Sequence, residues 1–401
     1  MEISLRRFRG FDGERFSVLL DVHGMPLYYP TLFSTWVLRN GALAANSITN
    51  ALNALKALHA WETHAGIDLE STFSQGELLD ENQIRDLSDF LQCSLVRDVG
   101  KKVVSINRKP KVVGASTHYF RMTVAADYVE FLANRLAQGV QAVRIEKMVS
   151  AIKANRPIKP SKSSDDLDET HLSDEVIEAL ENALRPGAEN NPARDYGVQL
   201  RNALMFTILR ATGMRRGELL NLKIEDVDFG ANTLKVVRRP DSKGDTRRHQ
   251  PTSKTLPRRM ALLPELIGKI RVYVMTERNK VPGARKHGYL FVTHKAGPTQ
   301  GAALSISAFG KLMMELAEVV AGAGFHAHIL RHNWNYGFSR IADAQGMSPE
   351  GEHKIRSYLM GWSETSNSAG VYNRRHIKEK AQESALELQR RYSNKSEKDK
   401  R

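Results

Sequence analysis

The spacing of hydrophobic residues divides the chain into a first part dominated by a helical repeat and a second part that mixes helices with strands. Residues 1–25 carry a strand repeat instead. Phe16, Val18 and Leu20 occupy alternate positions, and a Gly-Phe-Asp-Gly turn at 10–13 precedes them. This pattern predicts two short strands joined by a hairpin. We therefore expect a small β extension at the N-terminus, over 1–25.

Between residues 31 and 136, apolar residues recur every three or four positions, which predicts amphipathic helices. Ser47 is a suitable N-terminal cap for one helix, and another is expected after Ser116. We expect these helices to form one domain, over 26–152. Their apolar faces consist of Ile48, Leu52, Leu55 and Leu58 in the first helix, and of Phe120, Val124, Tyr128, Phe131 and Leu132 in the second.

A polar stretch at 153–170 separates this domain from the rest of the chain. It contains two prolines and few apolar side chains, a composition typical of a linker. Beyond it, Ser173 can cap a helix whose first turn is acidic, and a helix over 197–212 is expected to end at Gly213. The second domain therefore begins near residue 171.

The second domain is expected to contain strands as well as helices. Residues 232–239 and 257–263 have the composition of strands on either side of a basic loop, and 307–321 has a helical repeat. The end of the chain is densely charged. We expect the domain to span 171–380 and a basic tail to follow it over 381–401.

The composition narrows the class of protein. Lysine and arginine total 59 against 45 aspartates and glutamates, a net charge of +14, which favours nucleic acid as partner ahead of an acidic membrane surface. A single cysteine, Cys93, excludes an internal disulfide and a cysteine-rich metal site. No apolar run reaches the roughly 18 residues of a membrane span, and the N-terminus lacks the apolar core of a signal peptide. A cytoplasmic, nucleoid-associated protein is expected.

Four short segments of the second domain carry residues suited to phosphate chemistry. The first is Ala-Thr-Gly-Met-Arg-Arg-Gly-Glu-Leu-Leu-Asn-Leu at 211–222, and the second is a basic loop at 238–259. The third is His-Ile-Leu-Arg-His at 328–332. The fourth is Met-Gly-Trp at 360–362, ten residues before Tyr372.

In this order, the four segments resemble the motifs of the tyrosine site-specific recombinases, also called phage-type integrases. That family has an Arg after a Thr-Gly pair, a Lys on a hairpin, His-x-x-Arg, then His or Trp, and finally Tyr. The resemblance covers about 173–380, and the first domain matches the family's helical core-binding domain in length and helix pattern. It implies a mainly α fold with a small β component: a helical core-binding domain followed by an α+β catalytic domain.

Arg215 and Arg331 are the expected phosphate clamp. Attack on a DNA phosphodiester adds negative charge in the transition state. Two planar, permanently ionised guanidinium groups can bind the non-bridging oxygens through paired, charge-assisted hydrogen bonds. We therefore predict that these two arginines carry catalysis.

Tyr372 is the expected nucleophile. Because a free phenol has a pKa near 10, only roughly 0.1% is ionised at pH 7, and a base or strongly cationic surroundings must assist it. His328 is the expected proton acceptor. Tyr358 and Tyr392 compete for the role, but the first precedes the Gly-Trp element and the second lies far into the charged tail.

The departing 5′ oxygen needs a proton, which the family takes from a Lys on a hairpin. Lys254 is the favoured candidate, and Lys243, on a Lys-Gly turn, is the alternative. Trp362 occupies the position at which many members have His. Its indole N–H can donate to a phosphate oxygen but cannot transfer a proton as His does.

Two further residues are expected to support the site. Glu218 falls one helical turn after Arg215, where it can hold an active-site arginine or a backbone group; an exposed salt bridge is the alternative. His332 can orient the site or pack. A zinc site at His326, His328 and His332 is disfavoured, because Arg331 places a cation between two of the ligands.

The sequence therefore predicts a DNA recombinase that forms a 3′-phosphotyrosyl link and needs neither metal, ATP nor another cofactor. The expected partners are double-stranded DNA and accessory DNA-binding proteins, with no membrane. The family resemblance implies a homotetramer on two DNA sites. A non-catalytic DNA-binding protein on this fold and a type IB topoisomerase are the alternatives. Phosphate contacts are expected from Lys101, Lys102, Arg108, Lys109, Lys111, Lys243, Arg247 and Arg248.

Overall fold

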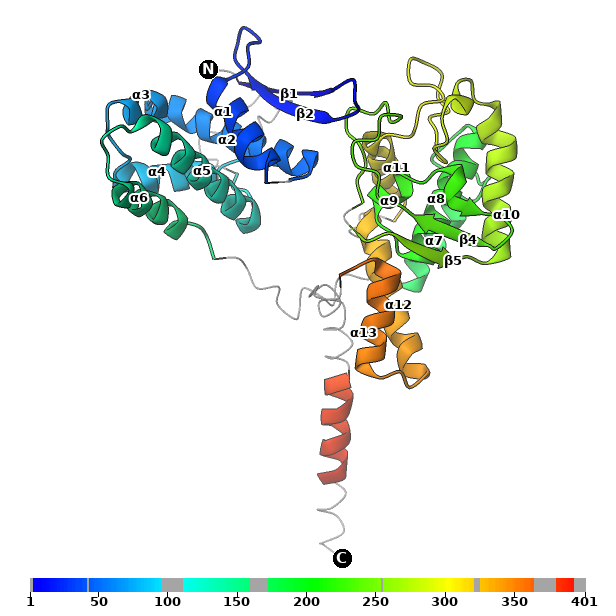
Figure 1. Cartoon of the computed structure of the whole chain (residues 1–401). Coiled ribbons are helices and arrows are strands. Elements are labelled where there is room, and N and C mark those ends of the chain that lie inside the picture. The colour runs from blue at the N-terminus through cyan, green and yellow to red at the C-terminus, as the bar shows by residue number, and fades with distance from the viewer. Residues whose placement is uncertain are drawn as a thin grey trace, which may run out of the picture. The chain divides into compact units, whose positions relative to one another are not determined.

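A computed structural model describes residues 3–41, 43–94, 111–158, 172–253, 255–320, 325–363 and 380–392 of the chain. The chain divides into two compact units, Met1–Ser161 and Lys162–Arg401 (Figure 1). We call them the N-terminal unit and the C-terminal unit. The division falls inside the polar stretch that was predicted as a linker.

The N-terminal unit begins with the predicted hairpin. Strands β1 (Ser4–Arg9) and β2 (Arg15–Leu20) pair antiparallel, with Leu5 opposite Leu19. Ile3 and Leu19 enter the hydrophobic core of the unit, so the hairpin is part of that core.

The helices of the N-terminal unit, drawn in blue to green in Figure 1, share one apolar core. Its centre includes Leu52, Leu55 and Trp61, each without exposed surface. Ser47 is not a cap as predicted: the helix begins at Ala45 after the extended Ala44, so Ser47 lies within the first turn. The helices are α1 (Tyr28–Phe33), η1 (Ser34–Arg39), α2 (Ala45–Ala65), α3 (Leu69–Ser74), α4 (Glu81–Leu91), α5 (Ala115–Leu136) and α6 (Ala142–Ala154).

The C-terminal unit is mixed, with most of its described residues in helices. Its strands are β3 (Val227–Asp228), β4 (Thr233–Val236) and β5 (Arg258–Ala261). Its helices are α7 (Asp174–Leu184), α8 (Tyr196–Thr212), α9 (Arg216–Leu220), η3 (Ile224–Asp226), α10 (Pro264–Tyr273), η4 (Val274–Arg278), η5 (Ala284–Lys286), α11 (Ile306–Val319), α12 (Ala327–Ala344) and α13 (Pro349–Met360). The fold class predicted from the sequence, mainly α with a small β component, is confirmed.

Several boundaries follow from local chemistry as predicted. The Ser173 hydroxyl caps α7 by accepting from the Val176 amide. Helix α8 ends at Gly213, whose φ of 60° lies in the left-handed region that favours glycine. The three-stranded sheet is antiparallel in the order β3-β4-β5, and the basic loop joins β4 to β5.

Helix α8 lies at the centre of the C-terminal unit. Its Leu204, Ile208 and Leu209 are buried in the unit's main hydrophobic core. Helices α7, α10 and α12 pack against it. The last turn of α8 is therefore rigidly placed, and it leads directly into the Thr-Gly-Met-Arg segment. Among the described residues, no helix combines the length and the apolar character needed to cross a membrane.

Candidate active site

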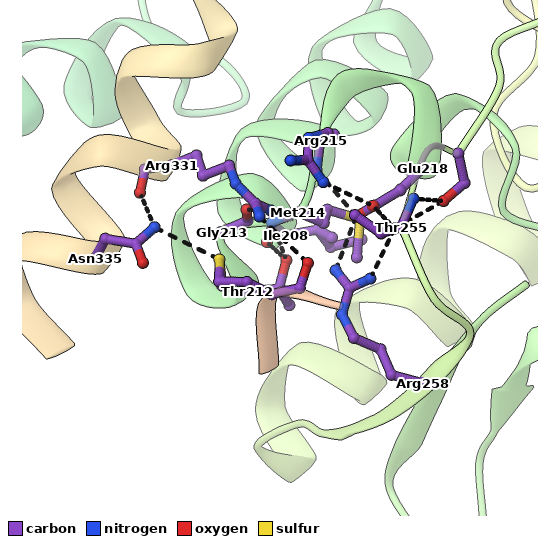
Figure 2. A network of polar contacts seen from close by, with 12 residues as sticks. Ile208, Thr212, Gly213, Met214, Arg215, Glu218, Thr255, Arg258, Arg331 and Asn335 are labelled. Carbon is purple, nitrogen blue, oxygen red and sulfur yellow. Dashed lines mark hydrogen bonds and ion pairs between the residues drawn. The ribbon is translucent and has the colours of Figure 1, made fainter. Parts of the chain in front are cut away.

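The predicted catalytic residues that the structure describes lie on or beside three helices of the C-terminal unit. Arg215 precedes α9, His328 and Arg331 lie on α12, and Trp362 follows α13. Figure 2 shows Arg215 and Arg331 on either side of the turn that follows α8. Lys254 and Tyr372, together with Lys101, Lys102, Arg108 and Lys109, lie outside the described residues.

The turn after α8 brings α12 close to this site. A Cβ atom at Gly213 would lie 2.8 Å from the Trp334 ring of α12, so a larger residue would push the two helices apart. The Trp334 indole N–H donates to the Ala211 carbonyl at 3.1 Å. Gly213 therefore has two roles. Its backbone adopts the left-handed conformation that ends α8, and its lack of a side chain leaves room for the Trp334 ring.

Arg331 is a fully buried cation that joins two helix ends. Its Nη1 donates to the Gly213 carbonyl at 2.8 Å and its Nη2 to the Met360 carbonyl at 3.2 Å. The guanidinium carbon lies 5.3 Å from the centre of the Trp362 ring, within the range of a cation–π contact. Arg331 thus fixes the end of α8 relative to the end of α13.

Glu218 is a buried carboxylate that collects three donors. Its Oε2 accepts from the Arg215 backbone N–H at 3.0 Å and from Arg258 Nη2 at 2.8 Å. Its Oε1 accepts from the Thr255 hydroxyl, and Figure 2 shows these contacts. Burial raises the pKa of Glu218, but the hydrogen bond and charge of Arg258 and the other donors outweigh burial and lower it below its ordinary value. Glu218 is therefore ionised at neutral pH.

The Arg215 side chain borders the same carboxylate. Its Nη1 lies 3.9 Å from Glu218 Oε1, and 31% of the side chain is exposed. This arrangement leaves the guanidinium partly accessible while its backbone is held by a hydrogen bond at the start of α9.

The loop segment around Thr255 is clamped between α9 and the end of α13. A Cβ at Gly217 would lie 2.5 Å from the Thr252 carbonyl oxygen, so α9 packs directly on the loop backbone. The Leu256 amide donates to the Gly361 carbonyl at 2.9 Å. These contacts fix the described residues that flank Lys254 in the sequence.

The His328 imidazole lies among positive groups. Its ring and that of His332 meet edge to face, with centroids 4.8 Å apart. Burial on the protein side lowers the pKa of His328 to about 4, and the charges of His332, Arg331, Arg215 and His326 act in the same direction. The other side of His328 is exposed to solvent. His328 is therefore neutral at pH 7 and has the protonation state that a proton acceptor needs.

His326 has a structural partner. Its Nδ1 accepts from the Ile329 amide at 3.2 Å, which caps α12. The described residues contain no group of three or more His, Cys, Asp or Glu side chains arranged to hold a metal ion.

Arg247 is the clear departure from the predicted DNA contacts. Its side chain is buried, pairs with the buried Asp245 at 2.8 Å, and donates from Nη1 to the Leu220 and Leu304 carbonyls, each at 2.9 Å. It therefore anchors the basic loop internally rather than facing a phosphate. Lys243, Arg248 and Lys111 are exposed. Asp245, two residues before Arg247, supplies the negative charge that allows Arg247 to be buried. A count of charges over the loop does not distinguish a buried, paired arginine such as Arg247 from an exposed one such as Arg248.

Sequence reasoning missed Arg258, although its strand contained the signal. Along β5, Arg258 and Met260 are buried while Arg259 and Ala261 are exposed. The period of two places Arg258 on the same face as the core residue Met260. A buried arginine needs an acid partner, and the nearest candidate in this site is Glu218.

Comparisons with known proteins identify the family of the chain. The family model described as "Phage integrase family" matches residues 172–373. Tyrosine recombinase XerD of Halalkalibacterium halodurans is 27% identical over 146 residues, which cover 36% of this chain and 42% of that protein. XerD of Yersinia pestis is 27% identical over 135 residues, covering 31% and 45%. The chain thus spans less than half the length of these curated relatives.

A solved structure shares the fold. XerH, a site-specific recombinase described as bound to a palindromic difH substrate in a post-cleavage complex, has a TM-score of 0.50 at 17% sequence identity. The match covers 86% of this chain and 80% of that one. At this identity the likeness concerns the fold alone.

Proposed function

The chain belongs to the phage integrase family, and from this premise we propose that it is a site-specific DNA recombinase that cuts and rejoins DNA through a 3′-phosphotyrosyl intermediate. The observation that carries the proposal is the convergence of Arg215, Arg331 and a neutral His328 on one site. The charges of both arginines act on the His328 imidazole. Such a site suits a phosphodiester that gains negative charge as it reacts.

In the proposed cleavage step, the Tyr372 oxygen attacks phosphorus and the bond to the 5′ oxygen breaks. His328 accepts the phenol proton, and Lys254 or Lys243 donates a proton to the departing 5′ oxygen. The partly exposed Arg215 guanidinium and the Trp362 indole stabilise the charge on the phosphate oxygens. The buried Arg331 adds its positive charge to the site while it holds the ends of α8 and α13 together. The 5′ hydroxyl of a partner strand then attacks the phosphotyrosyl link, which reverses the step without ATP or metal.

The remaining expectations form part of the same proposal. Residues 171–380 constitute the catalytic domain, and 26–152 form a DNA-binding domain with the 1–25 extension packed into it. Four copies act on two DNA sites in synapsis, with accessory proteins where the sites require them. The exposed Lys111, Lys243 and Arg248 contact phosphate, as do the predicted basic residues between 101 and 109.

The proposal is tested against its two alternatives with supercoiled plasmids in EDTA and without ATP. One plasmid carries two copies of the DNA that flanks the gene, and a control plasmid carries none. A recombinase yields a rearranged product from the first plasmid only. Relaxation of both plasmids without rearrangement indicates a type IB topoisomerase. Binding without either product indicates a non-catalytic DNA-binding protein and contradicts the proposal.

A further inference from the structure

We propose that Arg258 is a positioning residue of the active site and that it acts through Glu218. The pair holds two segments that flank the predicted catalytic groups: the start of α9 at Arg215 and the loop segment at Thr255. The inference rests on the proposed function, because it concerns the rate of the DNA cleavage described above. Arg258 itself needs no contact with a reacting atom for this role.

The ion pair is sealed from solvent. The Arg258 side chain is 1% exposed and that of Glu218 is 0% exposed, with Nη2 and Oε2 separated by 2.8 Å. A lone carboxylate at such a depth is strongly disfavoured as an ion, and its pKa rises until it protonates. Arg258 supplies the compensating charge, so Glu218 can stay ionised and accept from several donors at once.

The geometry uses the fork of the guanidinium. While Nη2 reaches Glu218, Nη1 donates to the Thr255 hydroxyl at 3.3 Å. The Thr255 hydroxyl in turn donates to Glu218 Oε1, which closes a ring of contacts among three side chains (Figure 2). A lysine has one ammonium group and cannot reproduce two divergent N–H donors of fixed geometry.

Arg258 also lies against the third segment of the site. A Cβ at Gly361 would come within 2.7 Å of Arg258 Nη1, and Gly361 immediately precedes Trp362. The three segments that carry Arg215, flank Lys254 and carry Trp362 therefore meet at one guanidinium. Misplacement of any of them by a fraction of an ångström is sufficient to slow a reaction that depends on orientation.

The test is single-turnover formation of the covalent protein–DNA product on a nicked duplex from the gene's flanks, at saturating protein. Arg258→Met is expected to slow cleavage about 100-fold, and Arg258→Lys about 10-fold, while the dissociation constant for DNA stays within about 3-fold. The matched control is Arg259→Met, which removes the same charge from the exposed face of the same strand. It is expected to cleave at the wild-type rate once DNA binding is saturated.

A second variant separates positioning from folding. In the double variant Glu218→Gln/Arg258→Met, no unpaired charge is buried, so its thermal stability is expected to exceed that of Arg258→Met. Its cleavage rate is expected to remain at least about 10-fold below that of the wild type. In the wild type the Arg215 amide and the Thr255 hydroxyl donate to different oxygens of Glu218, whereas the glutamine amide has one acceptor oxygen. A stable, DNA-binding but slow protein supports the positioning role.

Two results overturn the inference while leaving the proposed function intact. One is an Arg258→Met rate equal to that of Arg259→Met. The other is a double variant whose rate returns together with its stability, which assigns Arg258 to folding alone. If the wild type and Arg259→Met form no covalent product, the proposed function fails and this inference falls with it.

Discussion

The two units of the molecule differ in what they bury. In the described part of the N-terminal unit, the buried polar side chains are Arg15, Ser34, Thr49, Ser88 and His118. In the C-terminal unit, the buried side chains include a whole set of charged ones: Arg201, Glu218, Asp226, Asp245, Arg247, Arg258, Arg278, Arg331, Glu352 and Arg356. Among the described residues, the first unit buries one arginine and is otherwise held by apolar packing, whereas the second encloses many charged side chains.

The two kinds of interior have different physical consequences. Apolar burial stabilises a fold without fixing the direction of any one group. A buried ion pair contributes little net stability, but breaking it is costly because one charge is left alone. Several of the buried charges, including Arg331 and Glu218, hold backbone groups at the candidate active site. The buried charges of the C-terminal unit thus fix the positions of backbone groups at the candidate active site.

The largest effect on stability is expected from Glu218→Ala. The change leaves Arg258 buried without its partner and removes the acceptor for the Arg215 amide. Urea unfolding of the full-length protein, followed by far-UV circular dichroism, is expected to show that the free energy of unfolding of the C-terminal unit falls by about 3–5 kcal/mol. Glu225→Ala, which removes a carboxylate that is 65% exposed beside Lys223, is the control, with a loss under about 1 kcal/mol. Equal losses would contradict the contrast between buried and exposed charge.

Leu55→Ala probes the apolar interior of the N-terminal unit. Leu55 has no exposed surface, so its truncation leaves a cavity. The free energy of unfolding of the N-terminal unit, measured with urea, is expected to fall by about 3 kcal/mol. Under native conditions the covalent cleavage rate at saturating DNA is expected to stay at the wild-type value, because the described segments of the candidate active site all belong to the C-terminal unit. A large fall in that rate at full DNA occupancy would show that the two interiors are not separable in function.

Arg248→Ala and Arg247→Ala compare neighbours within one loop. Removing the exposed Arg248 is expected to reduce the slope of log binding constant against log salt by about 1, with little change in stability. Arg247→Ala removes the guanidinium that pairs with the buried Asp245 carboxylate, and it is expected to lower the urea midpoint of unfolding. If Arg247→Ala reduced the salt slope and left the midpoint unchanged, the assignment of Arg247 as an internal anchor would be wrong.

The last expected effect is confined to one imidazole. Because the folded protein lowers the His328 pKa from 6.5 to about 4, its contribution to stability decreases as the pH falls from about 6.5 towards 4. NMR titration of the free protein is expected to give a midpoint near 4. A bound phosphate adds negative charge and is expected to raise that midpoint. A midpoint near 6.5 in the free protein would contradict the cationic setting described here.

Local sequence rules predicted the elements of both units well, for reasons visible in single residues. Ser173 and Gly213 end their helices by hydrogen bonding and backbone conformation that depend on a few neighbours. Ser47 failed as a cap because Ala44 already has the extended backbone at which the helix begins. The first residue of a helix depends on which of several adjacent residues adopts the extended backbone before it. The spacing of apolar residues does not determine that choice.

The site is less predictable because its contacts are distant in sequence. The Arg331 guanidinium meets the Gly213 carbonyl, 118 residues away, and Arg258 meets Glu218, 40 residues away. The resemblance to the recombinase motifs pointed to Arg215, His328 and Arg331 as a set but not to Arg258. Nothing local distinguishes Arg258 from the exposed Arg259 except the strand period. The same limit explains Arg247, which composition assigned to a DNA-binding loop.

The central claim, attack by Tyr372 on a phosphate held by Arg215 and Arg331, is tested most directly by covalent trapping. Wild-type protein and Tyr372→Phe are incubated with nicked, end-labelled DNA from the gene's flanks in EDTA, and the products are separated under denaturing conditions. The account predicts a labelled protein–DNA band with the wild type and none with the variant, while both bind the DNA equally. A covalent band that persists in Tyr372→Phe would contradict the assignment of the nucleophile.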